Sequence, residues 1–155
     1  MGLDMYLTAE KFFGGYSDEA GRDAVVDACG SSIPPMSKAS ASATVSFEVA
    51  YWRKANAIHG WFVQNVQDGE DRCERHHVTV DDIKGLVALC EGILAGGDPD
   101  ALPPVEGFFF GPTDDASWYL DYLQLTVDQL KPLCAWFDAE SGRRGEWSLF
   151  YQSSW

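Results

Sequence analysis

The sequence predicts one α+β domain, in which a small and mainly antiparallel sheet that includes both termini packs against about three helices. Three observations support this prediction. The length of 155 residues is typical of a single domain, so residues 1–155 are expected to form one unit. Strand-like segments lie at both ends of the chain, and segments with helical periodicity lie between them. No internal repeat of about 20 to 50 residues is visible, which argues against a repeat architecture.

Three short segments are predicted to form strands. Residues 3–8 alternate loosely between apolar and polar side chains, and residues 147–151 form an aromatic run near the other end. Residues 107–111 (GFFFG) are an apolar run short enough for a buried strand, with a glycine at each end that permits a close turn. We expect the two terminal strands to pair side by side and so to hold both ends of the chain in place.

The strongest helical pattern covers residues 47–67 and ends at Asp68-Gly69, because glycine readily adopts the left-handed conformation that closes a helix. One stripe of this predicted helix is apolar and should face the core. Its members are Tyr51, Trp52, Ala55, Ile58, Phe62, Val63 and Val66.

Further helices are predicted on both sides of this segment. A short helix is expected at residues 22–28. A longer one begins at Thr79, whose hydroxyl can cap the first turn together with Asp82. The last covers residues 114–131, and Pro132 is expected to end or kink it because the proline ring clashes with the preceding turn.

The segment near residues 30–43 is rich in serine, proline and alanine, a composition typical of loops. It predicts a flexible loop within the single domain.

The balance of charges limits the classes of partner. The chain has 24 acidic and 11 basic residues, a formal net charge of −13, which repels phosphate backbones and argues against direct binding of nucleic acid. Basic protein surfaces are better suited partners. The simplest explanation of the charge is nevertheless a surface that keeps the protein in solution.

The sequence also indicates a compartment. The N-terminus has no basic segment followed by an apolar run, and no segment approaches membrane-spanning length, so neither a signal peptide nor a membrane partner is expected. The four cysteines, Cys29, Cys73, Cys90 and Cys134, are far apart and form no CxxC pair, which predicts reduced thiols and a cytoplasmic location. No cofactor motif is present.

Residues 51–62 (YWRKANAIHGWF) contain the most informative candidate site. On a helix His59 lies within the apolar stripe, and Arg53, Asn56 and Gly60 line its edge. One interpretation is a core histidine with a hydrogen-bond partner, beside a surface ion pair of Arg53. The other is a ligand pocket formed by Trp52, Arg53, Asn56 and His59, with residues 108–110 as an aromatic wall, for an anionic or amide-bearing ligand.

Two weaker signals concern metal binding and catalysis. Cys73, Glu74, His76 and His77 have metal-ligand chemistry within a short window, but no second ligand pair stands at a zinc-binding spacing, so an exposed polar loop is favoured. No motif of a nucleophilic hydrolase, phosphate-binding loop or zinc protease is found, so the sequence gives no support for an enzyme.

Four segments together resemble a family of small hypothetical proteins encoded by bacteriophages and prophages. They are the opening MGLDMYL, YWRKANAIHGWF at 51–62, GFFFG at 107–111 and the closing FYQSSW at 150–155, and they span nearly the whole chain. The segment at 30–43 departs from the family. The resemblance implies a genomic setting, in the cytoplasm of a host cell, and no mechanism.

These observations lead to three hypotheses about function. The first is an acidic phage-type accessory protein that binds a host macromolecule, for example to inhibit a defence effector. The second is a small-ligand or nucleotide-binding protein, with hydrolase activity as one form of it, that uses the pocket around Arg53, Asn56 and His59. The third is a structural or self-associating subunit, which would show an exposed aromatic patch.

Overall fold

A computed structural model describes residues 2–14, 18–34, 41–140 and 142–155. Its sheet has four strands in the order β2-β1-β4-β3, and every neighbouring pair is antiparallel. The strands are β1 (Asp4–Phe13), β2 (Ala43–Arg53), β3 (His76–Val78) and β4 (Ser148–Ser154). The N-terminal and C-terminal strands lie side by side at the centre, so the predicted α+β class with an antiparallel sheet of both termini is confirmed.

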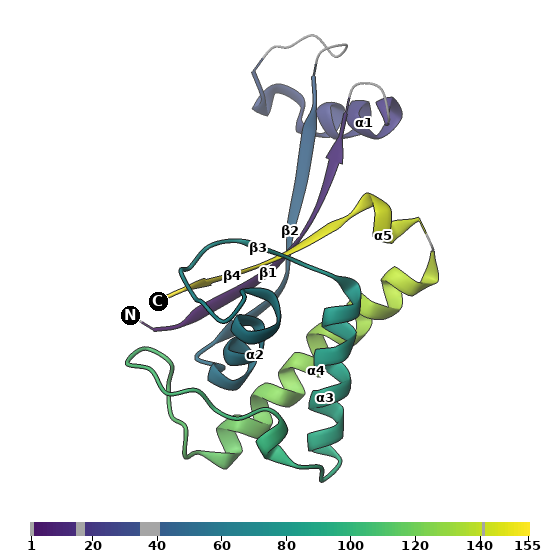
Figure 1. The fold of residues 1–155 in the computed structure, drawn as a ribbon. Helices are drawn as coiled ribbons and strands as arrows, with labels where there is room; N and C mark the ends of the chain where they lie inside the picture. The colour runs from purple at the N-terminus through teal and green to yellow at the C-terminus, as the bar shows by residue number, and fades with distance from the viewer. Residues whose placement is uncertain (1, 15–17, 35–40, 141) are drawn as a thin grey trace.

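Helices α2, α3 and α4 gather on one side of this sheet, and α3 packs against α4 (Figure 1). The helical elements are α1 (Glu19–Cys29), η1 (Gly30–Ser32), α2 (Asn56–Val66), α3 (Val80–Leu94), η2 (Pro99–Ala101), α4 (Ala116–Ala139) and α5 (Arg143–Glu146). The capping box predicted at the start of α3 is present, because the Thr79 hydroxyl accepts from the Asp82 amide and the Asp82 carboxylate accepts from the Thr79 amide.

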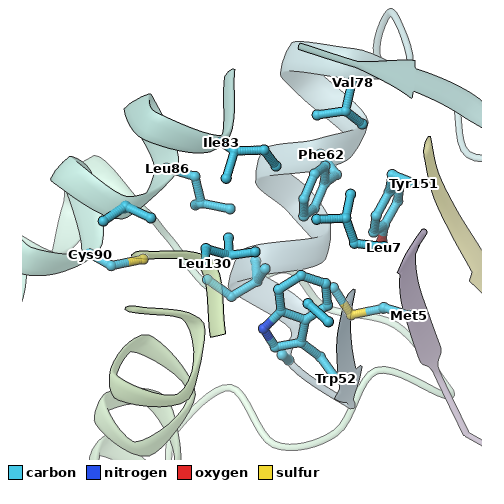
Figure 2. Packing of buried hydrophobic residues seen from close by; sticks show 14 of the residues in the cluster. Met5, Leu7, Trp52, Phe62, Val78, Ile83, Leu86, Cys90, Leu130 and Tyr151 are labelled. Carbon is cyan, nitrogen blue, oxygen red and sulfur yellow. The ribbon is translucent and has the colours of Figure 1, made fainter. Parts of the chain in front are cut away.

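The core fills the space between the sheet and these three helices. Figure 2 shows Met5 and Leu7 from β1 and Tyr151 from β4 on one side of Phe62 of α2. On the other side of Phe62, away from the sheet, lie residues of α3 and α4, namely Ile83, Leu86, Cys90 and Leu130. These side chains have almost no exposed surface. Because each fully buried large aliphatic or aromatic side chain contributes about 1.5 to 3 kcal/mol, this layer is the main source of stability.

The two strands β1 and β2 continue beyond the rest of the sheet as a two-stranded arm, with α1 at its far end (Figure 1). Pairing between β1 and β4 stops where Glu10 faces Ser148, whereas β1 and β2 remain paired as far as Phe13 and Ala43. Residues 11–13 and 43–45 therefore form a ribbon of two strands only.

The predicted helix over residues 47–67 is wrong in its first third. Residues up to Arg53 belong to β2, Lys54 has a positive φ of 58°, and only then does α2 begin. Within this part of β2 Ala50 and Trp52 are buried while Tyr51 and Arg53 are exposed, which is the period of two expected for a strand. The β-branched and aromatic residues of 44–49 favour that conformation.

The predicted strand at residues 107–111 is also wrong. This segment is a turn in which the Phe110 amide donates to the Gly107 carbonyl at 3.0 Å, and Gly111 has a positive φ of 90°. The Phe108 side chain is 96% exposed. The two glycines therefore allow the chain to turn back on itself, because glycine adopts backbone conformations that other residues avoid.

The last long helix, α4, passes through Pro132 and continues to Ala139, so the predicted end at residue 131 is wrong. Leu130, Cys134 and Phe137 are buried on both sides of the proline. We attribute the continuation to their burial, which outweighs the cost of about 3 kcal/mol for a proline within a helix.

Three further predictions concern features of the chain outside the sheet and the long helices. The helix expected at 22–28 is α1. The predicted loop near 30–43 falls partly outside the described residues, which omit 35–40. All four cysteines are free thiols, two of them buried. Among the described helices, none is both long and apolar enough to cross a membrane.

Candidate functional site

His59 lies in α2 and is only 1% exposed. Its Nδ1 is 2.8 Å from the Tyr151 hydroxyl, and its Nε2 is 3.1 Å from the Asp71 carboxylate. Burial lowers the pKa of His59 more than the nearby Asp71 charge raises it, so the imidazole is neutral at pH 7. We therefore assign the tautomer in which Nε2–H donates to Asp71 and Nδ1 accepts the Tyr151 proton.

Asp71 is the acceptor at the centre of this network. One of its carboxylate oxygens accepts from the Cys73 amide at 2.9 Å and from the Ser153 hydroxyl at 2.8 Å, and the other accepts from the Trp155 indole at 2.5 Å. Burial alone would raise the pKa of Asp71, but these hydrogen bonds outweigh it and lower the pKa. An ionised carboxylate thus connects the loop after α2 to the last residues of the chain.

Tyr151 closes the network on its inner side. The ring is fully buried and stacks on Phe62 at a centroid distance of 3.9 Å, as the parallel rings in Figure 2 show. Burial raises the pKa of Tyr151 well above its ordinary value, so its hydroxyl remains protonated. His59 is a buried histidine with hydrogen-bond partners, which agrees with the first of the two interpretations.

The other three residues of the predicted pocket have different surroundings. Trp52 is buried in β2, where its indole donates to the Thr126 hydroxyl at 2.9 Å. Arg53 is exposed, with its guanidinium 4.0 Å from Asp4, as expected for a surface ion pair. Asn56 is buried at the start of α2 and donates to the Pro112 carbonyl at 2.9 Å.

The structure thus does not gather these four side chains around one cavity. Asn56 lines a hollow whose empty space is about 300 Å³ with open solvent included. Its other walls include Lys54, Trp118, Tyr119 and Tyr122. The expected aromatic wall is also divided, since Phe110 contacts His59 edge-on at 4.9 Å while Phe108 is exposed.

The cluster of Cys73, Glu74, His76 and His77 does not form a metal centre. In the described parts of the chain, no group of three or more histidine, cysteine, aspartate or glutamate side chains is placed to hold a metal ion. His76 and His77 are neighbours in β3, and successive side chains of a strand point to opposite faces.

A different surface has the features of a binding site, and we call it the aromatic groove. It lies between the sheet and the second half of α4, and its empty space is about 540 Å³ with open solvent included. Only apolar side chains line it. They are Ala9, Phe47, Val49, Leu133, Trp136 and Trp147.

The Trp147 ring contacts the two other aromatic rings of the groove, and those two remain partly open to solvent. The Trp147 ring is 6.1 Å from Phe47 and 5.9 Å from Trp136. Phe47 is 55% exposed and Trp136 39%. The Arg143 guanidinium lies over the Trp136 ring at 4.3 Å and donates to the Trp136 carbonyl, which fixes this ring at the surface.

Sequence reasoning missed this groove for two specific reasons. Phe47 was assigned to a helix, and Trp136 lay beyond the predicted end at residue 131. The sequence did contain a signal that this helix continues past residue 131, because Leu130, Cys134 and Phe137 keep the helical spacing through Pro132. That continuation would have placed Trp136 on the outer side of the same helix.

Comparison of this chain with protein-family models, with curated proteins and with solved structures finds no match.

Proposed function

We propose that this protein acts by binding another macromolecule, and that the aromatic groove is the contact surface. The observation that carries the proposal is the exposure of Phe47 and Trp136 in an apolar groove. Residues that dominate the energy of protein interfaces are mostly tryptophan, tyrosine and arginine, in well-packed central pockets. Trp136, Trp147 and Arg143 have this composition and are already held in contact.

The energetics of the groove favour a partner. Covering apolar surface is worth about 25 cal/mol per Å², so aromatic rings that are open in the free protein supply binding energy when they are covered. Because neighbouring rings and Arg143 already hold Trp136, little side-chain entropy is lost on binding.

The setting that we propose is that of a phage-type accessory protein whose partner is a macromolecule of the host cytoplasm, for example a defence effector. Support comes from the resemblance of four segments to phage and prophage proteins, and from the charge. A net charge of −13 attracts basic surfaces over long range and disfavours nucleic acid. The third hypothesis, self-association, also has an exposed aromatic patch in its favour, but two copies would repel each other.

A second candidate function is the binding of a small anionic ligand in the hollow beside Asn56. The specific observation is that α2 begins without a side-chain cap at Ala55, so the amides of its first turn are available to an acceptor. Lys54 lines the same hollow. This candidate retains Asn56 from the predicted pocket but requires neither Trp52 nor His59.

The chain provides a matched pair of variants to test the first candidate. Trp136 and Trp118 both lie on α4 and are 39% and 37% exposed, but only Trp136 lines the aromatic groove. In a pull-down from host lysate, Trp136→Ala should lose a saturable partner that the wild type and Trp118→Ala retain. Equal recovery by all three would contradict the proposal. Loss with Trp118→Ala alone would favour the hollow beside Asn56, which Trp118 lines.

A further inference from the structure

The free edge of β2 borders the aromatic groove. β2 is the outermost strand of the sheet, and Phe47 and Val49 of this strand line the groove. An outermost strand presents a row of amides and carbonyls that no neighbouring strand has paired, which makes it a template for another strand.

One end of this edge is covered by α4. Near the end of β2 the Tyr51 amide donates to the Gln129 side chain of α4 at 2.9 Å, so α4 occupies the edge there. Farther along, Ser46, Phe47 and Glu48 are exposed. Of the features that protect such edges, residues 43–49 contain no lysine or proline, and they do contain the charged Glu48 and a shift of register at Val49.

Along this edge the two faces of the sheet differ in chemistry. Phe47 is paired with Ala9, which belongs to the helix-facing side together with Met5 and Leu7. Glu48 is paired with Thr8 on the opposite face, and among the described residues it makes no ion pair. A strand added here would therefore present alternate side chains to an apolar groove and to an unpaired carboxylate.

We propose that the edge of β2 at residues 46–48 pairs with an extended, basic segment of the partner. The apolar side chains of that segment enter the aromatic groove, and its lysine or arginine side chains lie beside Glu48. This inference rests on the proposed function and specifies the partner. Main-chain hydrogen bonds give such added strands their affinity, and the pockets for alternate side chains give the specificity.

Charge decides between a basic segment and a second copy of this chain. Each copy has a net charge of −13, so the pairing of two copies is opposed by repulsion, whereas a basic segment is attracted.

The test uses a fluorescent, end-capped peptide of about eight residues, a typical strand length, in which leucine and lysine alternate. Its binding to the full chain is followed by fluorescence anisotropy. Glu48→Lys should weaken the affinity about tenfold, and Glu74→Lys, an equal change of charge near β3 at the other edge of the sheet, should have little effect. A peptide methylated on alternate backbone nitrogens, so that one of its edges cannot donate, should lose most of its affinity.

Three results would overturn this inference. One is a methylated peptide that binds as well as the parent, which would mean that the groove takes side chains without strand pairing. Another is an equal loss of peptide affinity with Glu48→Lys and with Glu74→Lys, which would mean that the peptide responds to net charge alone and not to the position of Glu48. The third is sedimentation showing a dimer that Glu48→Lys and the peptide both disrupt, because a second copy would then occupy the edge. None of these three results bears on the proposed function itself. That proposal fails if Trp136→Ala still recovers the host partner.

Discussion

Replacing Asp71 with asparagine tests the hydrogen-bond network that fixes the end of the chain. The Asp71 carboxylate accepts from the Cys73 amide and the Ser153 hydroxyl, and it faces the His59 imidazole and the Trp155 indole. An asparagine has one acceptor oxygen in place of two. Its NH₂ group is itself a donor, so it cannot accept the hydrogen bonds that the replaced carboxylate oxygen accepted.

The size of the effect follows from this count. At least two of the four donors lose their acceptor, and each buried donor without a partner costs about 1 to 3 kcal/mol. Since the Trp155 side chain is exposed and can reach water, one buried donor is left without a partner, and we expect Asp71→Asn to lower the free energy of unfolding by about 1 to 3 kcal/mol.

Urea denaturation followed by tryptophan fluorescence measures this change, provided that the slope with denaturant stays the same. Asp68→Asn is the matched control, since Asp68 is exposed in the same loop and has a positive φ that asparagine tolerates. Loss of less than about 0.5 kcal/mol by Asp71→Asn, within the usual range of surface substitutions, would refute the network as described.

Three other predictions follow from burial and packing. Because burial lowers the pKa of folded His59, the unfolded chain binds the extra proton more readily, and the free energy of unfolding should fall as the pH drops through 6.5; a pH series in urea should show a flatter profile for His59→Gln. Gly60→Ala should destabilise the fold by about 1 to 3 kcal/mol in thermal unfolding, because a Cβ at this position would lie 2.4 Å from the Val105 side chain; an unchanged melting temperature would contradict the close packing. With a thiol reagent at neutral pH, exposed Cys29 should react quickly and Cys90 should not, because Cys90 is buried and burial raises the pKa of its thiol to about 12; equal rates would contradict this packing.

Local signals in the sequence were sufficient for much of the fold. The alternation near the N-terminus and the aromatic run near the C-terminus predicted β1 and β4, and their pairing at the centre of the sheet is confirmed. The start of α3 was predicted because the capping residues Thr79 and Asp82 satisfy amides within their own turn. Such features depend on neighbours in sequence, so no tertiary information is needed to recognise them.

The errors arose where contacts between distant residues decide the structure. The apolar residues of 47–53 fit a helical stripe as well as a strand, and it is pairing with β1 that selects the strand. The aromatic run 108–110 looks buried in sequence, yet the glycines beside it allow a turn that leaves Phe108 in solvent.

The candidate site was harder still to predict. The sequence left His59 as either a core histidine or a pocket residue. Its partners Asp71 and Tyr151 lie 12 and 92 positions away in sequence, so their role follows only from the fold. The aromatic groove combines Phe47 of β2 with Trp136 of α4 and Trp147 before β4. No spacing rule connects three such segments.

Hydroxyl-radical footprinting of Trp136 in the complex with a partner recovered from lysate is the most direct test of binding through the aromatic groove. Trp118 provides the internal reference, since it is nearly equally exposed on the same helix. We predict that the partner protects Trp136 from oxidation several-fold and leaves the oxidation rate of Trp118 unchanged. Protection of Trp118 with Trp136 still open would contradict the account.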